Sequence, residues 1–276
     1  MDESIYTASS SWLYRQHPIC LVAVLMVVMT VTAESGFRLG RRWHPRTDDA
    51  RRGHLASVMG SLLGLLALLL SFTFAMSANR YDTRRQMVMS EANVLGALYL
   101  QSRVLPDAPR KAFKQILRQY VALRAQAALL RHDASAKETA QAIAQAEGLQ
   151  DQMLNVIKTS AELEPPAKST DAMLKGLIEA VSVYRSRVFA LESRVPDSII
   201  WLILAGSATA MGAVGLFGGL GNHRGVPARV ILSILLCGTI YVVLDLDRPH
   251  EGLIKISQTP MLHLSQILDR DAEAKP

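Results

Sequence analysis

The chain has 276 residues, of which 50% are hydrophobic, and a mean hydropathy of +0.18; together these exclude an ordinary soluble enzyme. Two cysteines, Cys20 and Cys237, are too few for the disulfide framework of a small secreted domain. The formal net charge is +6, but many arginines gather in one short segment, which argues against a nucleic-acid-binding surface and for a membrane edge.

Four apolar segments hold most of the hydrophobic residues. A helix needs about 20 mainly apolar residues to cross the ~30 Å hydrocarbon layer of a bilayer. We therefore predict transmembrane helices at residues 17–36, 55–78, 198–220 and 228–244. The first and last segments are short, so a buried helix of a soluble protein is the alternative for either one alone. Their pairing with two longer segments favours membrane spans.

A signal peptide is the rival interpretation of the first span, because residues 31–33 have the small-residue pattern of a cleavage site. A signal peptide begins with a positive region, whereas this chain offers only Arg15 against Asp2 and Glu3. We predict that the span is retained as an anchor, preceded by an N-terminal segment at 1–16.

The loop between the first two spans, residues 37–54, is rich in arginine. Its six arginines are Arg38, Arg41, Arg42, Arg46, Arg51 and Arg52. Counting also Arg224 and Arg229 around the short loop 221–227, this side of the membrane holds eight basic residues, against three near the opposite ends of the spans, Arg15, Arg248 and Lys255. The positive-inside rule then places loop 37–54 in the cytoplasm and residues 79–197 in the periplasm or outside, in a bacterial inner membrane.

Residues 79–197, between the second and third spans, have the pattern of a soluble helical bundle. Breaks at Pro106 and Pro109, at 132–135 and at Pro165–Pro166 divide the segment into four helices. Apolar residues recur at steps of three and four, most clearly at Leu174, Leu177, Val181, Tyr184, Val188 and Leu191. The predicted fold is all-α: four transmembrane helices in two hairpins, a bundle inserted between the second and third, and a C-terminal segment at 245–276.

Two features predict how the spans continue and pack. No proline or glycine follows Ala78, so the second span should continue as a helix to about Leu105, whereas Pro196 should restart or kink the chain before the third. Pairs of glycines four residues apart, at 60/64 and 215/219, allow close helix packing. We favour packing of spans within one chain over a subunit interface for both pairs.

The residues carry no recognisable catalytic motif. The sequence has no Cys-x-x-Cys, no His-Glu-x-x-His, no phosphate-binding glycine loop and no Gly-x-Ser-x-Gly elbow, and its seven histidines have no metal-ligand spacing. We therefore expect no catalytic, cofactor or metal site, and a protein that is not an enzyme and binds no nucleic acid.

A first cluster of candidate residues follows the second span. Its members are Arg80, Asp82, Arg84, Arg85 and Glu91. Glu91 shares a helical face with Val88 and Leu95, and a carboxylate buried without a partner is costly. We predict that Glu91 pairs with an arginine, most plausibly Arg185 or Arg187 and otherwise Arg124. An ion-interacting or gating carboxylate is the alternative.

A second cluster, Asp245, Asp247 and Arg248, follows the fourth span. It is either a polar helix stop or an ionic contact in which an arginine lies between the two acids. That arginine would be Arg248 itself or one of the arginines after the second span, which would close both hairpins at one membrane face. Glu34, near the end of the first span, is either solvated or functional.

These residues together resemble the bacterial bestrophin-like family. The resemblance is carried by His54, Gly60, Gly64, Leu70-Ser71-Phe72-Thr73-Phe74, Arg80-Tyr81-Asp82, Arg84-Arg85, Glu91-Ala92-Asn93, Leu105-Pro106, Asp245-Leu246-Asp247-Arg248-Pro249, Gly252 and Ser257-Gln258. It covers roughly residues 20–265, and Gln101 stands where the family pattern has an arginine. Similarity to bestrophins implies four membrane helices per subunit, a homo-oligomer in the lipid bilayer and an inorganic anion as the transported species.

Two functional hypotheses follow. In the first, the protein is an oligomeric anion channel whose pore is lined by the second span, with Ser71, Thr73, Ser77 and Asn79 along it and a ring of Arg80, Arg84 and Arg85 at its end. In the second, it is a non-conducting membrane sensor or scaffold, and the soluble helices bind a ligand or partner.

Overall fold

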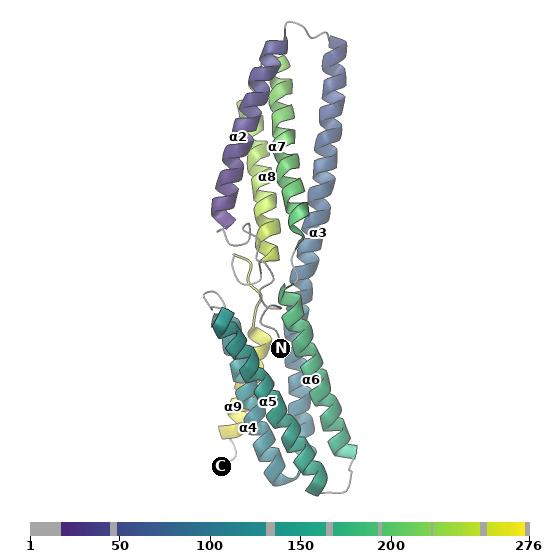
Figure 1. The fold of residues 1–276 in the computed structure, drawn as a ribbon, viewed down its shortest axis with the longest axis vertical. Helices are drawn as coiled ribbons and strands as arrows, with labels where there is room; N and C mark the ends of the chain where they lie inside the picture. Colours follow the sequence, from purple (N-terminus) through teal and green to yellow (C-terminus); the bar gives the residue numbers. More distant parts are fainter. Residues whose placement is uncertain are drawn as a thin grey trace. The chain divides into compact units, whose positions relative to one another are not determined.

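The computed structural model describes residues 18–44, 49–130, 136–163, 168–192, 195–221, 223–248 and 253–273. Within these ranges all regular structure is helical, which confirms the all-α prediction (Figure 1). The elements are α2 (Pro18–Trp43), α3 (Asp49–Gln101), η3 (Ser102–Val104), α4 (Asp107–Leu130), α5 (Ala136–Leu163), α6 (Lys168–Glu192), α7 (Asp197–Leu220), α8 (Val226–Asp247) and α9 (Thr259–Glu273). The predicted N-terminal segment 1–16 and the breaks at 132–135 and Pro165–Pro166 lie outside the described residues.

The chain divides into two compact units, and each is described by itself. The first, here called the membrane unit, comprises Met1–Tyr81 and Arg194–Ile254. The second, the bundle unit, comprises Asp82–Ser193 and Lys255–Pro276. The C-terminal residues expected as one separate segment at 245–276 are therefore shared between both units, and α9 belongs to the bundle unit.

The membrane unit contains four helices that are long and apolar enough to cross a bilayer, as predicted. These helices extend beyond the expected spans. The first span continues to Trp43, since no proline interrupts it and Arg41 and Arg42 complement the carbonyl end of its last turn. The fourth span does not end at Asp245, because the helix continues to Asp247.

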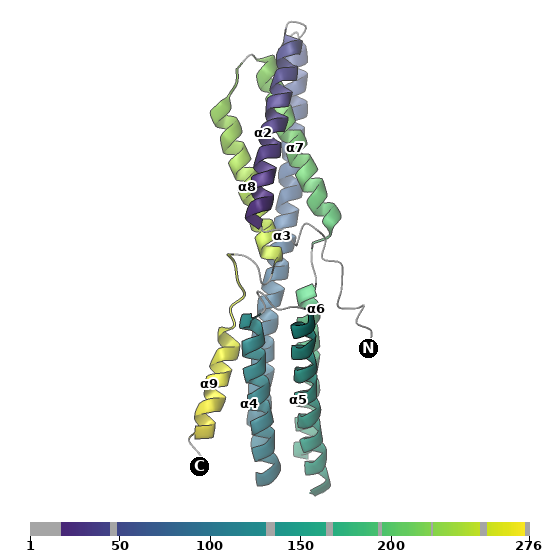
Figure 2. The ribbon, with the colours of Figure 1, turned by 60° about the vertical axis from the view of Figure 1, so that its left-hand side comes forward.

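The packing of the membrane unit is organised by α2, which lies against α7 and α8 (Figures 1 and 2). A Cβ atom on Gly215 would lie 2.0 Å from the carbonyl oxygen of Ala33, and one on Gly36 would lie 2.0 Å from that of Gly212. The two backbones are thus in direct contact. The expected arrangement of the four spans in two hairpins stays a prediction.

The two predicted glycine pairs differ in their surroundings. Gly215 and Gly219 both face the backbone of α2, which confirms the prediction of packing within one chain. A Cβ on Gly60 or Gly64 would meet nothing within 4 Å, so this pair makes no close contact with another helix in the part of the chain that the structure describes. The glycine pattern itself is the same in both cases, and the neighbouring helix makes the difference.

Helix α3 is a single helix of 53 residues, as the absence of a break after Ala78 predicts. In its apolar part, Leu66 and Leu70 face the core of the membrane unit, where Leu66 approaches Gly206 of α7. Leu65, Leu68 and Phe72 are exposed on the remaining surface of the helix. One face of this span therefore lacks a partner within the described part of the chain.

The bundle unit has a conventional hydrophobic core. Its largest fully buried side chains include Phe113, Leu117 and Tyr120 of α4, with Leu95 and Leu98 of α3, Met153 of α5 and Met173 of α6. The predicted stripe on the last bundle helix is confirmed, because Leu177 and Tyr184 are buried and Leu174, Val181 and Val188 pack against the core. Helix α9 adds Met261, Leu264 and Leu268 and lies beside α4 (Figure 2).

Candidate functional site

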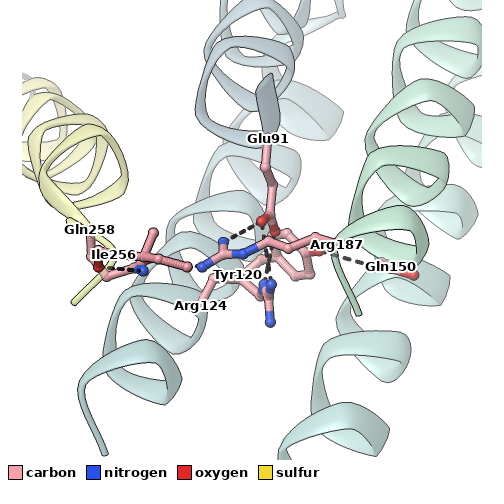
Figure 3. A network of polar contacts seen from close by, with 7 residues as sticks. All are labelled: Glu91, Tyr120, Arg124, Gln150, Arg187, Ile256 and Gln258. Atoms are coloured by element: carbon pink, nitrogen blue, oxygen red, sulfur yellow. Dashed lines mark hydrogen bonds and ion pairs between the residues drawn. The ribbon is translucent and has the colours of Figure 1, made fainter. Parts of the chain in front are cut away.

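The bundle unit contains a buried ionic network centred on Glu91 of α3 (Figure 3). The Glu91 side chain is 0% exposed, and it accepts hydrogen bonds from two arginines on two other helices. Nε of Arg124, on α4, lies 2.8 Å from Oε1, and Nη2 of the same guanidinium lies 3.3 Å from Oε2. Arg187, on α6, donates through Nη1 to Oε2. One carboxylate therefore holds three helices together.

Further polar contacts surround this centre. Arg187 also donates through Nη2 to Oε1 of Gln258, at 2.8 Å, which connects the network to the residue before α9 (Figure 3). The Arg124 guanidinium lies 4.6 Å from the ring centre of Tyr184, within cation–π range. Nε2 of Gln150, on α5, donates to the hydroxyl of Tyr120 at 3.0 Å. Every helix of the bundle unit thus contributes to the network or adjoins it.

The pKa values of the network follow from burial and from the presence of two guanidiniums around one carboxylate. Burial alone would raise the pKa of Glu91, but the charges and hydrogen bonds of Arg124 and Arg187 outweigh it and hold this pKa below its ordinary value. Burial, reinforced by the charge of Arg124, lowers the pKa of Arg187. Burial and the negative charge of Glu91 raise the pKa of the Tyr120 hydroxyl. The Glu91 carboxylate is ionised at neutral pH and forms ion pairs with two guanidiniums.

The sequence predicted the main contact of this network correctly. Glu91 is buried and paired with Arg187, and also with the alternative partner Arg124, whereas Arg185 is exposed on α6. Sequence reasoning did not single out Gln258 for this role. The residue follows a loop, where helical periodicity gives no information on which direction a side chain takes.

The membrane unit contains a second polar site, the carboxylate turn at the end of α8. The Asp245 carboxylate accepts hydrogen bonds from the backbone N–H groups of Leu253, at 3.1 Å, and Ile254, at 2.9 Å. The backbone N–H of Val195, just before α7, donates to the Asp247 carboxylate, with its nitrogen 3.2 and 3.0 Å from the two oxygens. Both acids are buried, and their charge is stabilised by main-chain amides.

These amide partners were not foreseen from the sequence. An arginine between Asp245 and Asp247 was expected, and this bridge stays a prediction; Arg248 itself is buried. Pro249 and Gly252 of the same turn lie outside the described residues. A sequence shows which side chains carry charge, but every residue other than proline has a backbone N–H, so no local pattern identifies the amides that an acid will meet.

The remaining candidate residues differ in their exposure and in their partners. Arg84 is buried, Arg80 is half-buried, and Arg85 is exposed. Asp82 is exposed and accepts a hydrogen bond of 2.7 Å from Gln86, one helical turn away. Glu34 of α2 forms a 3.1 Å ion pair with Arg38. In the described ranges no group of histidine, cysteine and acidic residues is arranged to hold a metal ion.

Comparison with known proteins identifies the family. The family model described as a bestrophin-like domain matches residues 27–261. Among solved structures, a bacterial bestrophin homologue from Klebsiella pneumoniae is similar with a TM-score of 0.63 and 17% identity, covering 92% of this chain and 96% of that chain. A structure described as a membrane protein variant gives a TM-score of 0.65 and 14% identity over 92% of this chain and 96% of that chain. No curated protein matches in sequence.

At these identities the structural similarity establishes the fold alone. The family match is broader evidence, because it extends from within α2 to the beginning of α9 and so includes all four apolar helices, the Glu91 network and the carboxylate turn. With its four helices suited to a bilayer, the chain is a membrane protein that belongs to the bestrophin-like family.

Proposed function

We propose that the protein is a homo-oligomeric ion channel of the bacterial inner membrane, selective for inorganic anions, with α3 lining the pore. The observation that carries the proposal is the uncovered face of the apolar part of α3. Three of the four spans pack on one another through α2, whereas α3 uses only one of its faces inside the chain. In an assembly of subunits around a central axis, the other face of α3 would line the pore.

The composition of this outward face supports a pore. One stripe of its exposed residues follows steps of three and four along the helix: Ser57, Ser61, Gly64, Leu68, Ser71, Ala75 and Asn79. Most residues of this stripe are small or polar, which suits a water-filled lumen, whereas the exposed Val58, Leu65, Phe72 and Phe74 lie beside it and suit contact with lipid or a neighbouring subunit. Two residues first expected on the pore are excluded, because Thr73 and Ser77 are buried inside the membrane unit.

The charges beyond this span support anion selectivity. Arg85 is exposed on α3, and each copy in an oligomer would contribute one such guanidinium to a ring. Rings of basic side chains select anions, because they lower the energy of an anion entering the pore. Arg84 is buried and does not belong to this ring.

The test is a planar-bilayer recording of the purified protein with unequal chloride salt concentrations on the two sides. We expect a conductance whose reversal potential lies toward that of chloride, and a shift toward cation selectivity for Arg85→Glu. Arg185→Glu, an equal charge change at an exposed position of α6, is the control and should leave the reversal potential unchanged. A protein that is oligomeric but conducts under no salt condition would support the non-conducting sensor or scaffold.

The sensor or scaffold has one specific observation in its favour. The bundle unit has its own core and its own buried ionic network, and such a structure would suit the binding of a partner as well as the support of a pore. The two functions differ in what mutations should do: substitutions at Ser71 and Arg85 alter conduction only in the channel.

The sidedness is tested separately, with the loop 37–54 proposed as cytoplasmic and residues 79–197 as periplasmic. In a background in which Cys20 and Cys237 are replaced by serine, a cysteine at the exposed position Lys175 should react with an impermeant thiol reagent in intact cells whose outer membrane is permeabilised. Labelling of Lys175→Cys only after lysis would reverse this orientation.

A further inference from the structure

Two arginines of the membrane unit converge on a single aromatic ring. The guanidinium carbon of Arg224, in the turn after α7, lies 5.5 Å from the ring centre of Phe37, and that of Arg229, in the first turn of α8, lies 5.4 Å from it. Phe37 belongs to α2 and is buried. Two parts of the chain that are distant in the sequence thus place two positive charges around one side chain.

The local structure fixes this arrangement. A Cβ on Gly219 would lie 2.3 Å from the carbonyl oxygen of Phe37, so the ring is anchored where α2 and α7 are in backbone contact. The turn after α7 is closed by a 3.1 Å hydrogen bond from the His223 N–H to the Gly218 carbonyl. Gly225, with φ of 50°, adopts the left-handed conformation that glycine tolerates and caps α8. The two guanidiniums are therefore held close to a rigid support.

Among the residues whose side chains the structure describes, no acid forms an ion pair with either arginine of this pair. Neither Asp nor Glu occurs between Asp197 and Asp245, or between Glu34 and Asp48. Glu34 is engaged by Arg38. The two guanidiniums repel each other across the ring, and an anion bound between them would be attracted to both.

The position of the pair indicates which anion is available. Arg224 and Arg229 lie where α7 ends and α8 begins, at the level where a spanning helix leaves the hydrocarbon layer. Val226 and Val230 of α8 and Leu39 of α2 are exposed nearby and provide an apolar surface. A ligand with a phosphate at one end and hydrocarbon at the other fits both features.

We propose that Arg224 and Arg229 bind the phosphate headgroup of an anionic phospholipid. Guanidinium groups match phosphate oxygens in bidentate geometry, and the N-terminal end of α8 adds a positive helix dipole at the same place. The acyl chains lie against the apolar surface of α8. The site requires only that these helices span a bilayer, so it is independent of the sidedness and of ion conduction.

The experiment is native mass spectrometry of the purified protein in detergent, titrated with phosphatidylglycerol or with zwitterionic phosphatidylcholine. The wild type should retain phosphatidylglycerol in preference to phosphatidylcholine. Arg224→Gln/Arg229→Gln should weaken phosphatidylglycerol binding about tenfold, since charge-assisted hydrogen bonds to the phosphate are lost. Arg41→Gln/Arg42→Gln removes the same charge from the end of α2 and should change the affinity far less.

Two further measurements test whether the planar guanidiniums and the acyl chains of the lipid are needed for binding. Arg224→Lys/Arg229→Lys keeps the charge but loses the planar donors, and it should bind with intermediate affinity. Inorganic phosphate should displace the lipid only weakly, because it has no acyl chains. The proposal is overturned if the Arg41/Arg42 control loses as much affinity as the Arg224/Arg229 variant, since binding would then follow net charge alone. Equal retention of both lipids by the wild type would overturn it too.

Discussion

The two units of this protein hold their helices together in opposite ways. In the membrane unit, α2 and α7 are joined backbone to backbone through glycines, and the hydroxyls of Thr30, Thr209 and Thr239 bond to carbonyls of their own helices. In the bundle unit, the helices are separated by large buried side chains, and polar groups bond across helices, as Gln150 does to Tyr120.

The physical reason for the contrast is the solvent of each unit. Apolar side chains gain little from leaving lipid for another helix, so helices in a bilayer associate when small residues let their backbones approach. In water, burial of apolar surface drives association, and large side chains supply more of it. The same chain follows both rules, and substitutions that are harmless in one unit should be severe in the other.

The largest effect is expected for a side chain added between α2 and α7. Gly215→Leu places a Cβ where the Ala33 carbonyl oxygen lies, so the two backbones must separate, at a cost of about 3 kcal/mol or more for overpacking a tight contact. Thermal unfolding in detergent should show loss of the membrane unit. Gly238→Leu, where a Cβ meets nothing within 4 Å, is the control. An unchanged Tm for Gly215→Leu would contradict the close packing.

The next largest effect is expected for loss of the Glu91 charge. Glu91→Gln leaves Arg124 and Arg187 buried without their counterion, and breaking such a pair typically costs about 3–5 kcal/mol. The Tm in detergent should fall by several degrees. Adding Arg187→Gln should recover part of the loss, so that the double-mutant cycle is non-additive. Strict additivity would show that the two residues act independently.

The pH dependence of stability tests the contribution of the Glu91 charge in a second way. Because the folded-state pKa of Glu91 lies below its ordinary value of 4.5, the ion pairs contribute fully above that value and are lost as the pH falls through the lowered pKa. The Tm difference between wild type and Glu91→Gln should therefore be full at neutral pH and shrink in acid. A constant difference across an acid titration through pH 4.5 and below would mean that folding does not lower the pKa of Glu91.

A smaller effect is expected at the carboxylate turn of the membrane unit. Asp247→Ala removes the acceptor of the Val195 N–H, and a buried hydrogen bond to a charged group contributes about 1.5–3 kcal/mol. Hydrogen exchange should show faster exchange of the Val195 amide. Asp82→Ala, which removes an exposed carboxylate, is the control and should leave that amide protected.

The smallest effect is expected for the exposed ion pair between Arg118 of α4 and Asp269 of α9. Both side chains are nearly half exposed, and surface pairs contribute about 0.2–1 kcal/mol. Arg118→Gln should lower the Tm slightly at low salt and not at all at high salt. A loss comparable to that of Glu91→Gln would mean that α9 is held mainly by charge and not by Met261, Leu264 and Leu268.

Much of this structure was predictable from local patterns. Hydropathy located the four spans, the proline and polar breaks divided the bundle into its helices, and Pro196 marked the start of α7. The pairing of Glu91 was predictable as well, because a carboxylate on an apolar helical face requires a cation. The C-terminal helix α9 was not predicted, because residues 245–276 were expected to form one separate segment, although Met261, Leu264 and Leu268 have helical spacing.

What only the tertiary structure decided is which surfaces meet. A glycine pair shows that a helix can be approached closely, but not by which helix: Gly215 meets α2, whereas Gly64 meets no other described residue within 4 Å. The Val195 amide that binds Asp247, and the convergence of Arg224 and Arg229 on Phe37, depend on segments far apart in sequence. The amides that bind Asp245 are close in sequence, but the path of the turn decides which of them it meets. Hydropathy and periodicity act over a few helical turns, so they determine where helices form, while the choice of partner depends on contacts that exist only once the chain has folded.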